Sequence, residues 1–350
     1  MHRIGILSFA HGHVNSYAAQ ILTFPDAQLV GAWDHDSERG IAQCKQFDIP
    51  FYKDIDEFLA LQHLDCVIVA SETNRHTDLC IRAMEAGKAV LLQKPMAITL
   101  ADCDRIIETA NRTGVWFSLA FQMRCDPQNI KMRELVQSGS LGKIGLIRRR
   151  HCIPVLFHKS FYEGGSKWHI DPVANKGMFF DDAIHPFDWL LWTTGRKPTT
   201  VYAEIDNVLT NVAPDDTGIA LFRFDDGLMA EVTNSSVTWA AENTTEIYGD
   251  KGVLIQNFGD APSCQYQPEN AAGLKLFLAL EPEKGWQVLD VPTPKSHGER
   301  IAGVARPFID SLSAGVPMCT AEEGRISVEL SLACYHASSN GSKVIFPFSE

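Results

Sequence analysis

Residues 86–95 read Ala-Gly-Lys-Ala-Val-Leu-Leu-Gln-Lys-Pro, and the interpretation of the chain starts from this stretch. A glycine that can end a helix precedes a short apolar run, which is typical of a strand buried on both faces of a parallel sheet. Gln93 and Lys94 then fall at the carboxyl end of that strand, where open α/β sheets bind ligands. Pro95 removes a backbone donor and favours an extended Lys94. Alone, Lys94 is equally compatible with a surface lysine whose stem covers apolar side chains.

Further apolar runs before and after this stretch extend the same pattern. Strands are predicted over residues 4–8, 29–33, 65–70 and 116–121, and helices over 77–85 and 100–113. Strands that alternate with helices predict a parallel sheet covered on both faces. From residue 199 onward the pattern changes to alternating strands separated by Asp- and Gly-containing turns, which is typical of an antiparallel sheet.

The turn after the first strand departs from the usual dinucleotide fingerprint. That fingerprint is Gly-x-Gly-x-x-Gly, whereas residues 8–13 read Ser-Phe-Ala-His-Gly-His. Small side chains at Ser8 and Ala10 still permit close approach, and the next helix still presents free N–H groups. His11 and His13 suggest a phosphate contact or a cleft lining more than a metal site, since no standard zinc spacing is present.

An acidic residue follows the second predicted strand. Asp34 stands where a carboxylate commonly grips the ribose hydroxyls of a dinucleotide. The structural alternative is a helix N-cap, a role for which Ser37 is equally suited.

Several of these segments together resemble the glucose-fructose oxidoreductase / inositol dehydrogenase (Gfo/Idh/MocA) family of NAD(P)-dependent oxidoreductases. The resemblance rests on residues 86–95, on the Ser-x-x-x-x-His of residues 71–76, and on Asp-x-x-x-His-x-x-Asp at residues 181–188. The Arg-x-x-Pro of residues 124–127 resembles the family's crossing between domains. The chain differs in having Gln93 where the family has glutamate, and in Glu72 and Thr73.

The resemblance implies a Rossmann dinucleotide-binding domain over residues 1–122. It also implies a C-terminal α+β domain with a mainly antiparallel open sheet over residues 123–350, for substrate binding and oligomerisation. It assigns a cofactor, NAD in preference to NADP, to Ser8, Phe9, Ala10, His11, Asp34, Ser71, Glu72, His76, Gln93 and Lys94. It assigns catalysis to Lys94, Asp181 and His185, and substrate contacts to Arg124, Trp168, His169 and Asp182. A homodimer or homotetramer is also implied.

The implied reaction transfers a hydride between NAD(P) and a secondary alcohol of a sugar, cyclitol or related polyol. On a helix Asp181 and His185 share a face because they are four residues apart. His185 is suited to accept the hydroxyl proton and Lys94 to stabilise the alkoxide, although the two roles could be exchanged. The structural alternative is a core histidine held by a carboxylate, and Pro186 predicts a kink unless the helix starts late.

Two other functions remain open at this point. One is a hydrolase or lyase that keeps NAD tightly bound and oxidises its substrate transiently. The other is a non-catalytic dinucleotide-binding regulator, which the missing glycines and Gln93 favour. Residues 155–176 are aromatic and irregular, which is typical of a functional segment such as a substrate lid.

Composition narrows the classes of function. A length of 350 residues fits two domains, and a formal charge of −12 argues against nucleic acid and anionic membranes as partners. Arg148–Arg150, the only basic cluster, is interpreted as sheet surface because strand side chains alternate. No apolar run is long enough for a transmembrane helix. The N-terminal residues enter a predicted strand without a signal-peptide pattern, which predicts a cytoplasmic location. Nine scattered cysteines without a CxxC pair indicate reduced thiols, and no metal requirement is expected.

Overall fold

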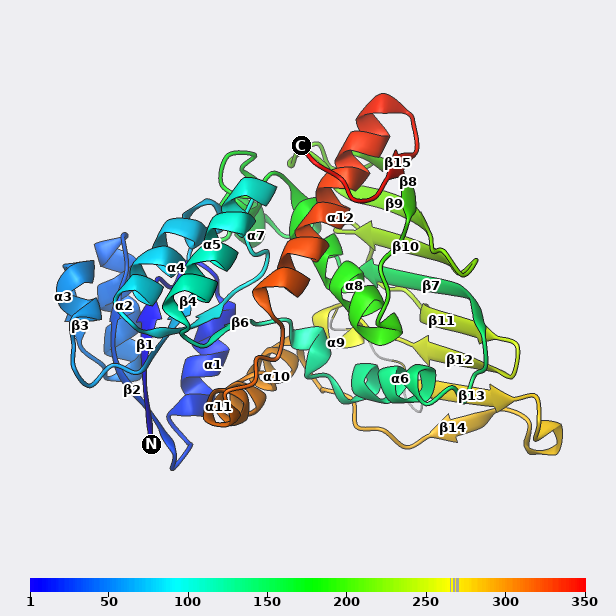
Figure 1. Ribbon diagram of the computed structural model, residues 1–350, viewed down its shortest axis with the longest axis horizontal. Coiled ribbons are helices and arrows are strands. Elements are labelled where there is room, and N and C mark those ends of the chain that lie inside the picture. The colour runs from blue at the N-terminus through cyan, green and yellow to red at the C-terminus, as the bar shows by residue number, and fades with distance from the viewer. Residues whose placement is uncertain (265, 267, 269–270) are drawn as a thin grey trace.

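Two sheets flanked by helices make up the structure, a computed structural model that describes residues 1–264, 266, 268 and 271–350 (Figure 1). The first is a six-stranded, wholly parallel sheet in the order β3-β2-β1-β4-β5-β6. Its strands are β1 (His2–Leu7), β2 (Ala27–Trp33), β3 (Phe51–Tyr52), β4 (Cys66–Val69), β5 (Ala89–Leu92) and β6 (Phe117–Leu119). This strand order reverses direction between β1 and β4, and the crevice at such a reversal is where doubly wound sheets bind ligands.

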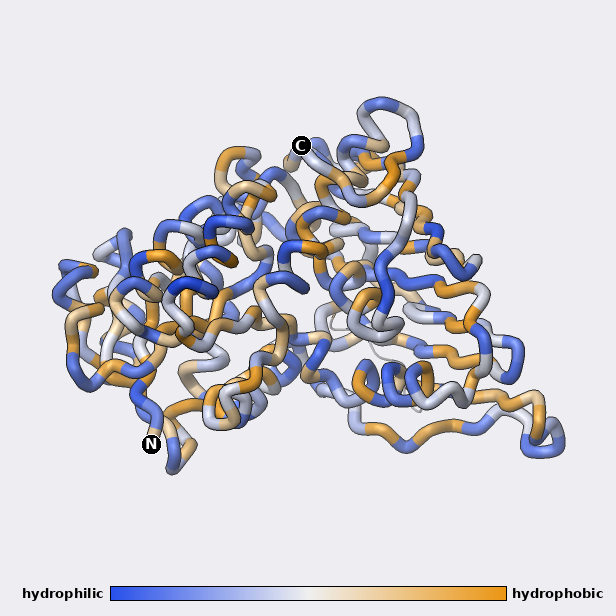
Figure 2. The backbone as a smooth tube through the Cα atoms, viewed as in Figure 1, coloured by the Kyte–Doolittle hydropathy of each residue, from blue (hydrophilic) through white to orange (hydrophobic). Residues whose placement is uncertain are grey.

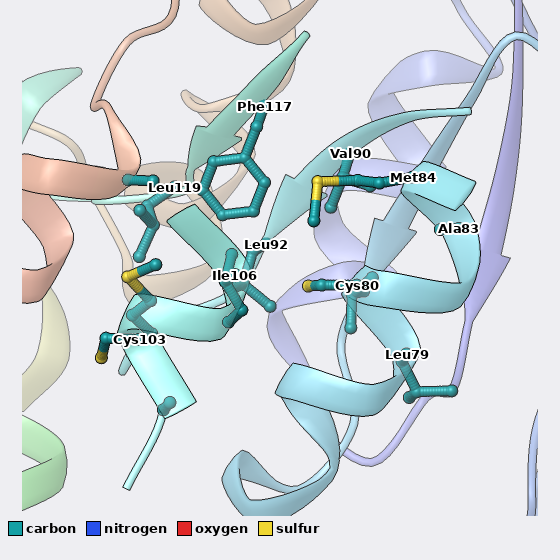
Figure 3. Close-up of a cluster of buried hydrophobic side chains, with 14 of the residues drawn as sticks. Leu79, Cys80, Ala83, Met84, Val90, Leu92, Cys103, Ile106, Phe117 and Leu119 are labelled. Carbon is teal, nitrogen blue, oxygen red and sulfur yellow. The ribbon is translucent and has the colours of Figure 1, made fainter. Parts of the chain in front are cut away.

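Helices cover both faces of the parallel sheet. They are α1 (His13–Ile21), α2 (Ser37–Phe47), α3 (Ile55–Leu59), α4 (His76–Glu85) and α5 (Leu100–Thr113), with the 3₁₀ turn η1 (Thr73–Arg75) before α4. Figure 3 shows side chains of β5 and β6 packed against those of α4 and α5, including Val90, Leu92 and Ile106. Because β5 is apolar on both faces, it is buried between helices, as its sequence predicted. The predicted Rossmann-type fold is confirmed.

The second sheet has nine strands in the order β14-β13-β12-β11-β7-β10-β9-β8-β15, and its only parallel pair among the described residues is β7–β10. The strands are β7 (Ile144–Cys152), β8 (Thr200–Asp206), β9 (Thr217–Arg223), β10 (Met229–Ser235), β11 (Asn243–Gly249), β12 (Gly252–Asn257), β13 (Leu274–Leu278), β14 (Gln287–Leu289) and β15 (Val344–Ile345). The mainly antiparallel sheet that was predicted is therefore confirmed.

One face of this sheet packs against helices α8 (Met178–Thr194) and α12 (Ala321–Asn340), and α6 (Pro127–Gln137) lies beside α8 (Figure 1). Figure 2 shows hydrophobic and hydrophilic residues alternating along these strands, so each strand turns one face to this core. On the opposite face Tyr202, Leu221 and Met229 are exposed. Helix α8 starts at Met178 and continues through Pro186, so the late start considered for this helix was wrong.

Shorter elements complete the chain: η2 (Gln122–Arg124), η3 (Val155–Phe157), α7 (Lys159–Tyr162), η4 (Lys167–Ile170), α9 (Ala261–Cys264) and η5 (Pro282–Lys284). Helices α10 (His297–Ala302) and α11 (Ala305–Ala314) return to pack against α1, and Phe308 enters the same core cluster as Ile4 and Tyr17. The division at residue 122 stays a prediction, and residues 297–314 add packing to the first sheet from beyond it. No helix in the described part of the chain is long and apolar enough to cross a membrane.

Candidate active site

A cavity of about 100 Å³ lies where the carboxyl edge of the parallel sheet meets α8 and β7. Its lining comes from the turn after β1, the loop after β5, η2, β7, the 155–176 segment, α8 and the region of α9 and α10. The lining residues are His11, His13, Lys94, Gln122, Met123, His151, Ile153, Val155, Phe161, His169, Met178, Asp181, Asp182, His185, Ser263 and His297. All three residues predicted as catalytic are among them.

Lys94 and Asp181 form a buried ion pair inside this cavity. Lys94 Nζ lies 2.9 Å from Asp181 Oδ2 and donates a second hydrogen bond to the Asp181 carbonyl at 3.2 Å. Asn175 Nδ2 donates to the other carboxylate oxygen of Asp181 at 3.0 Å. Burial alone raises the pKa of Asp181, but the Lys94 ammonium and His169 outweigh it, so this pKa lies below its ordinary value. The Asp181 carboxyl group is therefore ionised near neutral pH.

Asp182, the next residue, has no cation so close. Its Oδ1 atom lies 4.0 Å from Lys94 Nζ, and Ser236 Oγ donates to Oδ2 at 3.3 Å. Burial and the charge of Asp181 raise the pKa of Asp182 to about 6. Near neutral pH this carboxyl group can therefore hold or release a proton.

His185 faces the cavity without a carboxylate partner. The side-chain amide nitrogen of Gln122 lies 3.1 Å from His185 Nε2, and His185 Nδ1 is buried with no hydrogen-bond partner. Burial first, then the charge of Lys94, lowers the pKa of His185 well below its usual value. The imidazole is therefore neutral over the range in which the enzyme would work.

The aromatic segment over residues 155–176 closes the cavity on one side. Phe161 and His169 line the cavity, and Trp168 stacks on His169 with ring centroids 3.7 Å apart. Trp168 itself is not part of the lining, because its Nε1–H donates to the carbonyl of Ala10 at 3.2 Å. The structure thus places His169 at the cavity and Trp168 behind it, against the turn after β1, and the substrate contact of Trp168 stays a prediction.

The turn after β1 keeps the backbone shape of a nucleotide turn without its glycines. Ser8, at the first glycine position, has φ of 72°, in the left-handed region that favours glycine. A Cβ atom added to Gly12 would meet no atom within 4 Å, and α1 has no side-chain cap at its start. His11 Nε2 and His13 Nδ1 are buried without partners. An open helix N-terminus beside unpartnered polar atoms fits a phosphate group.

Asp34 is engaged by the same turn. Its carboxylate accepts hydrogen bonds from Phe9 N at 2.8 Å and Ser8 Oγ at 3.2 Å, and from Arg39 Nη2 at 2.7 Å. Asp36, rather than Asp34 or Ser37, caps α2 by accepting from Arg39 N. The helix-cap alternative for Asp34 is therefore wrong, and so is the capping role considered for Ser37.

The remaining residues assigned to the cofactor lie along the same edge of the sheet. Glu72 contacts His35 at 3.3 Å and Arg39 at 3.5 Å, and Ser71 is fully buried. His76 Nδ1 donates to the Pro95 carbonyl at 2.8 Å and so holds the loop that carries Lys94. Gln93 Nε2 donates to Tyr17 at 2.7 Å. The Phe9 ring stacks on Phe47 in the core, so only its backbone faces the turn.

Arg124 lies outside the cavity lining, and its role in substrate binding stays a prediction. Its guanidinium binds both oxygens of Asp188, the Met318 carbonyl and Glu323. These contacts hold the guanidinium in a buried network. Arg149 corrects a prediction, because its side chain is buried rather than on the sheet surface.

The residues present fit a nicotinamide dinucleotide at two places. The turn over residues 8–13 offers a helix N-terminus and unpartnered nitrogens, and Gln93 and Gln122 each bury an unpartnered carbonyl oxygen near Lys94. Buried polar atoms of this kind are normally satisfied, so they indicate a polar ligand. Asp34 is already paired with Arg39, so ribose hydroxyls would have to share that carboxylate with the guanidinium.

Sequence reasoning missed four residues that the fold brings to the site. Gln122, His151, Asn175 and His297 come from separate elements, and no spacing links them to Lys94 or α8. His151 follows three arginines near the end of its strand, so the sequence carried no clear signal for it. In the described part of the chain, no group of three or more His, Cys, Asp or Glu side chains could hold a metal ion.

Both halves of the chain match models of known protein families. Residues 4–121 match the model of an oxidoreductase family with an NAD-binding Rossmann fold, and residues 129–255 match the GFO/IDH/MocA C-terminal domain. The myo-inositol 2-dehydrogenase of Thermotoga maritima is 27% identical over 341 residues, which cover 95% of this chain and 94% of that protein.

Two solved structures share the fold over nearly the whole chain. An aldose-aldose oxidoreductase from Caulobacter crescentus, complexed with glycerol, has a TM-score of 0.81 at 19% identity and covers 99% of both chains. An oxidoreductase from Agrobacterium radiobacter, in complex with NAD+, L-tartaric acid and magnesium, has a TM-score of 0.82 at 18% identity and covers 98% of both. At these identities the likeness extends to the fold alone.

Proposed function

The chain belongs to the GFO/IDH/MocA family of NAD-binding oxidoreductases, and from this premise we propose that it oxidises a secondary alcohol of a sugar, cyclitol or related polyol. The observation that carries the proposal is the buried Lys94–Asp181 pair, which lies in the cavity at the carboxyl edge of the parallel sheet. The lining of that cavity is rich in groups that can donate to or accept from hydroxyls.

Lys94 stabilises the oxygen that loses its proton. The compact ammonium held by Asp181 presents a positive charge at a fixed place. Because water is excluded there, this charge stabilises a developing alkoxide more strongly than it would in solvent. Asp181 accepts a hydrogen bond from the ammonium, and Asn175 donates to Asp181, so these two residues fix the position of the ammonium. Asp182 offers a further acceptor or donor for a neighbouring hydroxyl of a polyol.

His185 takes the proton of the reacting hydroxyl in this proposal. As a neutral imidazole it has a lone pair to offer, and it shares the cavity with Lys94. In the unliganded structure Gln122 contacts His185 Nε2, so the substrate would have to replace that contact.

NAD is the proposed cofactor. It would be held by the backbone of residues 8–13, by Asp34 near the ribose, and by Gln93 and Lys94 near the nicotinamide. When bound, its nicotinamide ring accepts the hydride that leaves the alcohol carbon. Asp34 supports NAD over NADP because its carboxylate would face the 2′-phosphate with like charge.

Three further proposals concern access, assembly and location. The cavity of about 100 Å³ is smaller than ordinary small-molecule sites of roughly 300–1,000 Å³, so residues 155–176 must move to admit a sugar.

Exposed Tyr202, Leu221 and Met229 beside a hollow of about 540 Å³ support a homo-oligomer built on the second sheet. Nine cysteines, none of them paired, support a cytoplasmic location.

The test is a spectrophotometric screen of the purified protein with NAD over a panel of inositols, aldoses and deoxy- and amino-sugars. The proposal expects formation of reduced cofactor with at least one of them, and none with the matched deoxy compound that lacks the reacting hydroxyl. Product formation without net cofactor reduction would instead support the hydrolase or lyase. Cofactor binding without any turnover across the panel would support the regulator.

A further inference from the structure

His151 and Asp260 form a second buried acid–base pair at the cavity, separate from Lys94–Asp181. His151 is at the end of β7, and its Nδ1 atom lies 3.0 Å from Asp260 Oδ1. The other oxygen of Asp260 accepts a hydrogen bond from Cys152 N at 3.0 Å. Both side chains are buried, with relative exposures of 6% and 4%. Because both carboxylate oxygens are engaged, the carboxylate cannot rotate away from the imidazole.

This geometry fixes the orientation of the imidazole. The Nδ1–H group donates to Asp260, so Nε2 is the ring nitrogen left to accept a proton, and His151 is part of the cavity lining. The His151 ring lies 5.6 Å from the His185 ring, centroid to centroid, in an edge-on arrangement. A histidine oriented by a buried carboxylate is the usual arrangement of a proton acceptor.

The contrast with His185 is direct. Among the described residues no carboxylate hydrogen-bonds to His185, because Asp181 is held by Lys94 and Asn175. A proton placed on His185 therefore has no counter-charge in contact, whereas a proton placed on His151 has Asp260.

Charged groups from several elements surround the pair. Arg300 on α10 lies 4.0 Å from Asp260 and 3.4 Å from Asp126, and Arg149 on β7 is buried nearby. The formal charges of these two arginines and of Asp260 and Asp126 sum to zero. A proton on His151 therefore gives the cluster a net charge of plus one. Lys94 opposes that charge across the cavity and Asp182 favours it, whereas His185 and His297 are neutral because burial lowers the pKa of each.

Asp260 can stabilise the positive charge of a protonated His151. Burial alone raises its pKa, but the charge and hydrogen bond of His151, together with Arg300 and Arg149, bring the pKa to about 2. The carboxylate is therefore ionised throughout the pH range in which an imidazole titrates.

We propose that His151 is the terminal proton acceptor of the site, with Asp260 as the positioning residue that holds the imidazolium. The inference rests on the proposed alcohol oxidation and deepens it. As the hydride leaves the carbon to the cofactor, the substrate O–H bond breaks and its electron pair forms the second C–O bond. The released proton, passed through His185, forms an N–H bond at His151 Nε2. In the reverse direction His151 returns that proton.

The kinetic test uses the full-length holoenzyme with NAD and the best alcohol from the screen. His151→Asn should lower kcat for oxidation by about 10²-fold, the range for lost acid–base catalysis, while KM and the NAD dissociation constant change less than threefold. Added imidazole should restore part of kcat in proportion to its free-base concentration. His63→Asn, an exposed histidine in a distant loop, is the matched control and should leave kcat unchanged.

The Asp260→Asn variant distinguishes a role of Asp260 in positioning the His151 imidazole from a role in packing alone. Loss of the carboxylate disfavours the imidazolium, so the acidic limb of the pH dependence of kcat/KM should move down by about one pH unit or more. The inference is overturned if kcat stays within threefold of wild type in both variants and the acidic limb of kcat/KM does not move in Asp260→Asn. So does a folded His151→Asn variant with low kcat that imidazole at every concentration fails to restore.

A measurement without substrate keeps the two proposals distinguishable. The proton NMR spectrum of the unliganded protein should contain a low-field N–H resonance that disappears in His151→Asn and moves upfield in Asp260→Asn. A wild-type protein that oxidises no alcohol overturns the proposed function, and with it the role of His151. A protein that oxidises alcohols but lacks this resonance overturns only the His151–Asp260 assignment.

Discussion

Lys94–Asp181 and Arg124–Asp188 both join helix α8 to the first half of the chain, and both are buried, with N–O distances of 2.9 and 2.7 Å. They differ in what surrounds the cation. Arg124 binds both Asp188 oxygens and two further acceptors in a packed network, whereas Lys94 faces a cavity shared with His185 and Asp182. Burial and pairing alone therefore do not identify a catalytic group. The free space beside the cation does.

The largest effect is expected where the ion pair faces that space. Lys94→Ala should lower kcat by about 10²–10⁴, or roughly 3–5 kcal/mol, because the developing alkoxide loses its counter-charge. Lys94→Arg should not restore kcat, since a planar fork cannot replace a compact ammonium in this site. Initial rates and a cofactor titration on the folded variants would test this.

The Lys94→Ala/His185→Ala double variant tests whether the two groups act on the same proton transfer. Groups that act on one proton transfer are non-additive, so the double variant should lose less than the product of the two single losses. Turnover of Lys94→Ala within twofold of wild type would remove the catalytic assignment and make Lys94 equivalent to Arg124.

The second effect concerns stability rather than rate. Asp188→Asn should lower the free energy of unfolding by about 3–5 kcal/mol, because it leaves the buried Arg124 without its main partner. In the folded fraction kcat should stay within threefold of wild type. Urea denaturation followed by circular dichroism measures the first quantity. The exposed pair Arg105–Asp78 is the control, and Arg105→Ala should change neither quantity measurably.

Asp182 provides an intermediate case on α8, a buried carboxyl without a close cation. Its folded-state pKa of about 6 exceeds the ordinary value of 3.8, so its ionisation opposes folding. The stability associated with its protonated form is present below about pH 4 and lost as the pH rises through 6. Asp182→Asn should therefore raise the free energy of unfolding at pH 8 by on the order of 2–3 kcal/mol and change little at pH 4. Equal effects at both pH values would contradict the assignment.

The smallest effect is expected at the partly exposed pair Asp34–Arg39. Wild type should prefer NAD over NADP by more than tenfold in kcat/KM, because Asp34 repels the 2′-phosphate. Asp34→Ser should reduce that preference, since Arg39 would then be free to pair with the phosphate. Equal efficiency with both cofactors, unchanged in the variant, would show that this carboxylate does not select the cofactor.

The sequence predicted those parts of the molecule that are encoded locally. Buried strands such as residues 89–92 and the shared face of Asp181 and His185 follow from side-chain periodicity. The pairing of Asp260 with His151 could not be predicted, because 109 residues separate them and a loop supplies the carboxylate. The acceptors around Arg124 could not be predicted either, because a spacing pattern shows that a residue is present and says nothing of which acceptors the fold brings to it.

The return of α10 and α11 to the first sheet has a consequence for biosynthesis. Val304, Phe308 and Ile309 complete the core that holds α1, yet they leave the ribosome after most of the second sheet has been made. Domains generally fold in the order of their synthesis. Here the half that is made first stays unsealed until nearly the whole chain has emerged. The side chains of α1 that α10 and α11 cover therefore stay exposed to solvent during most of the elongation of the chain.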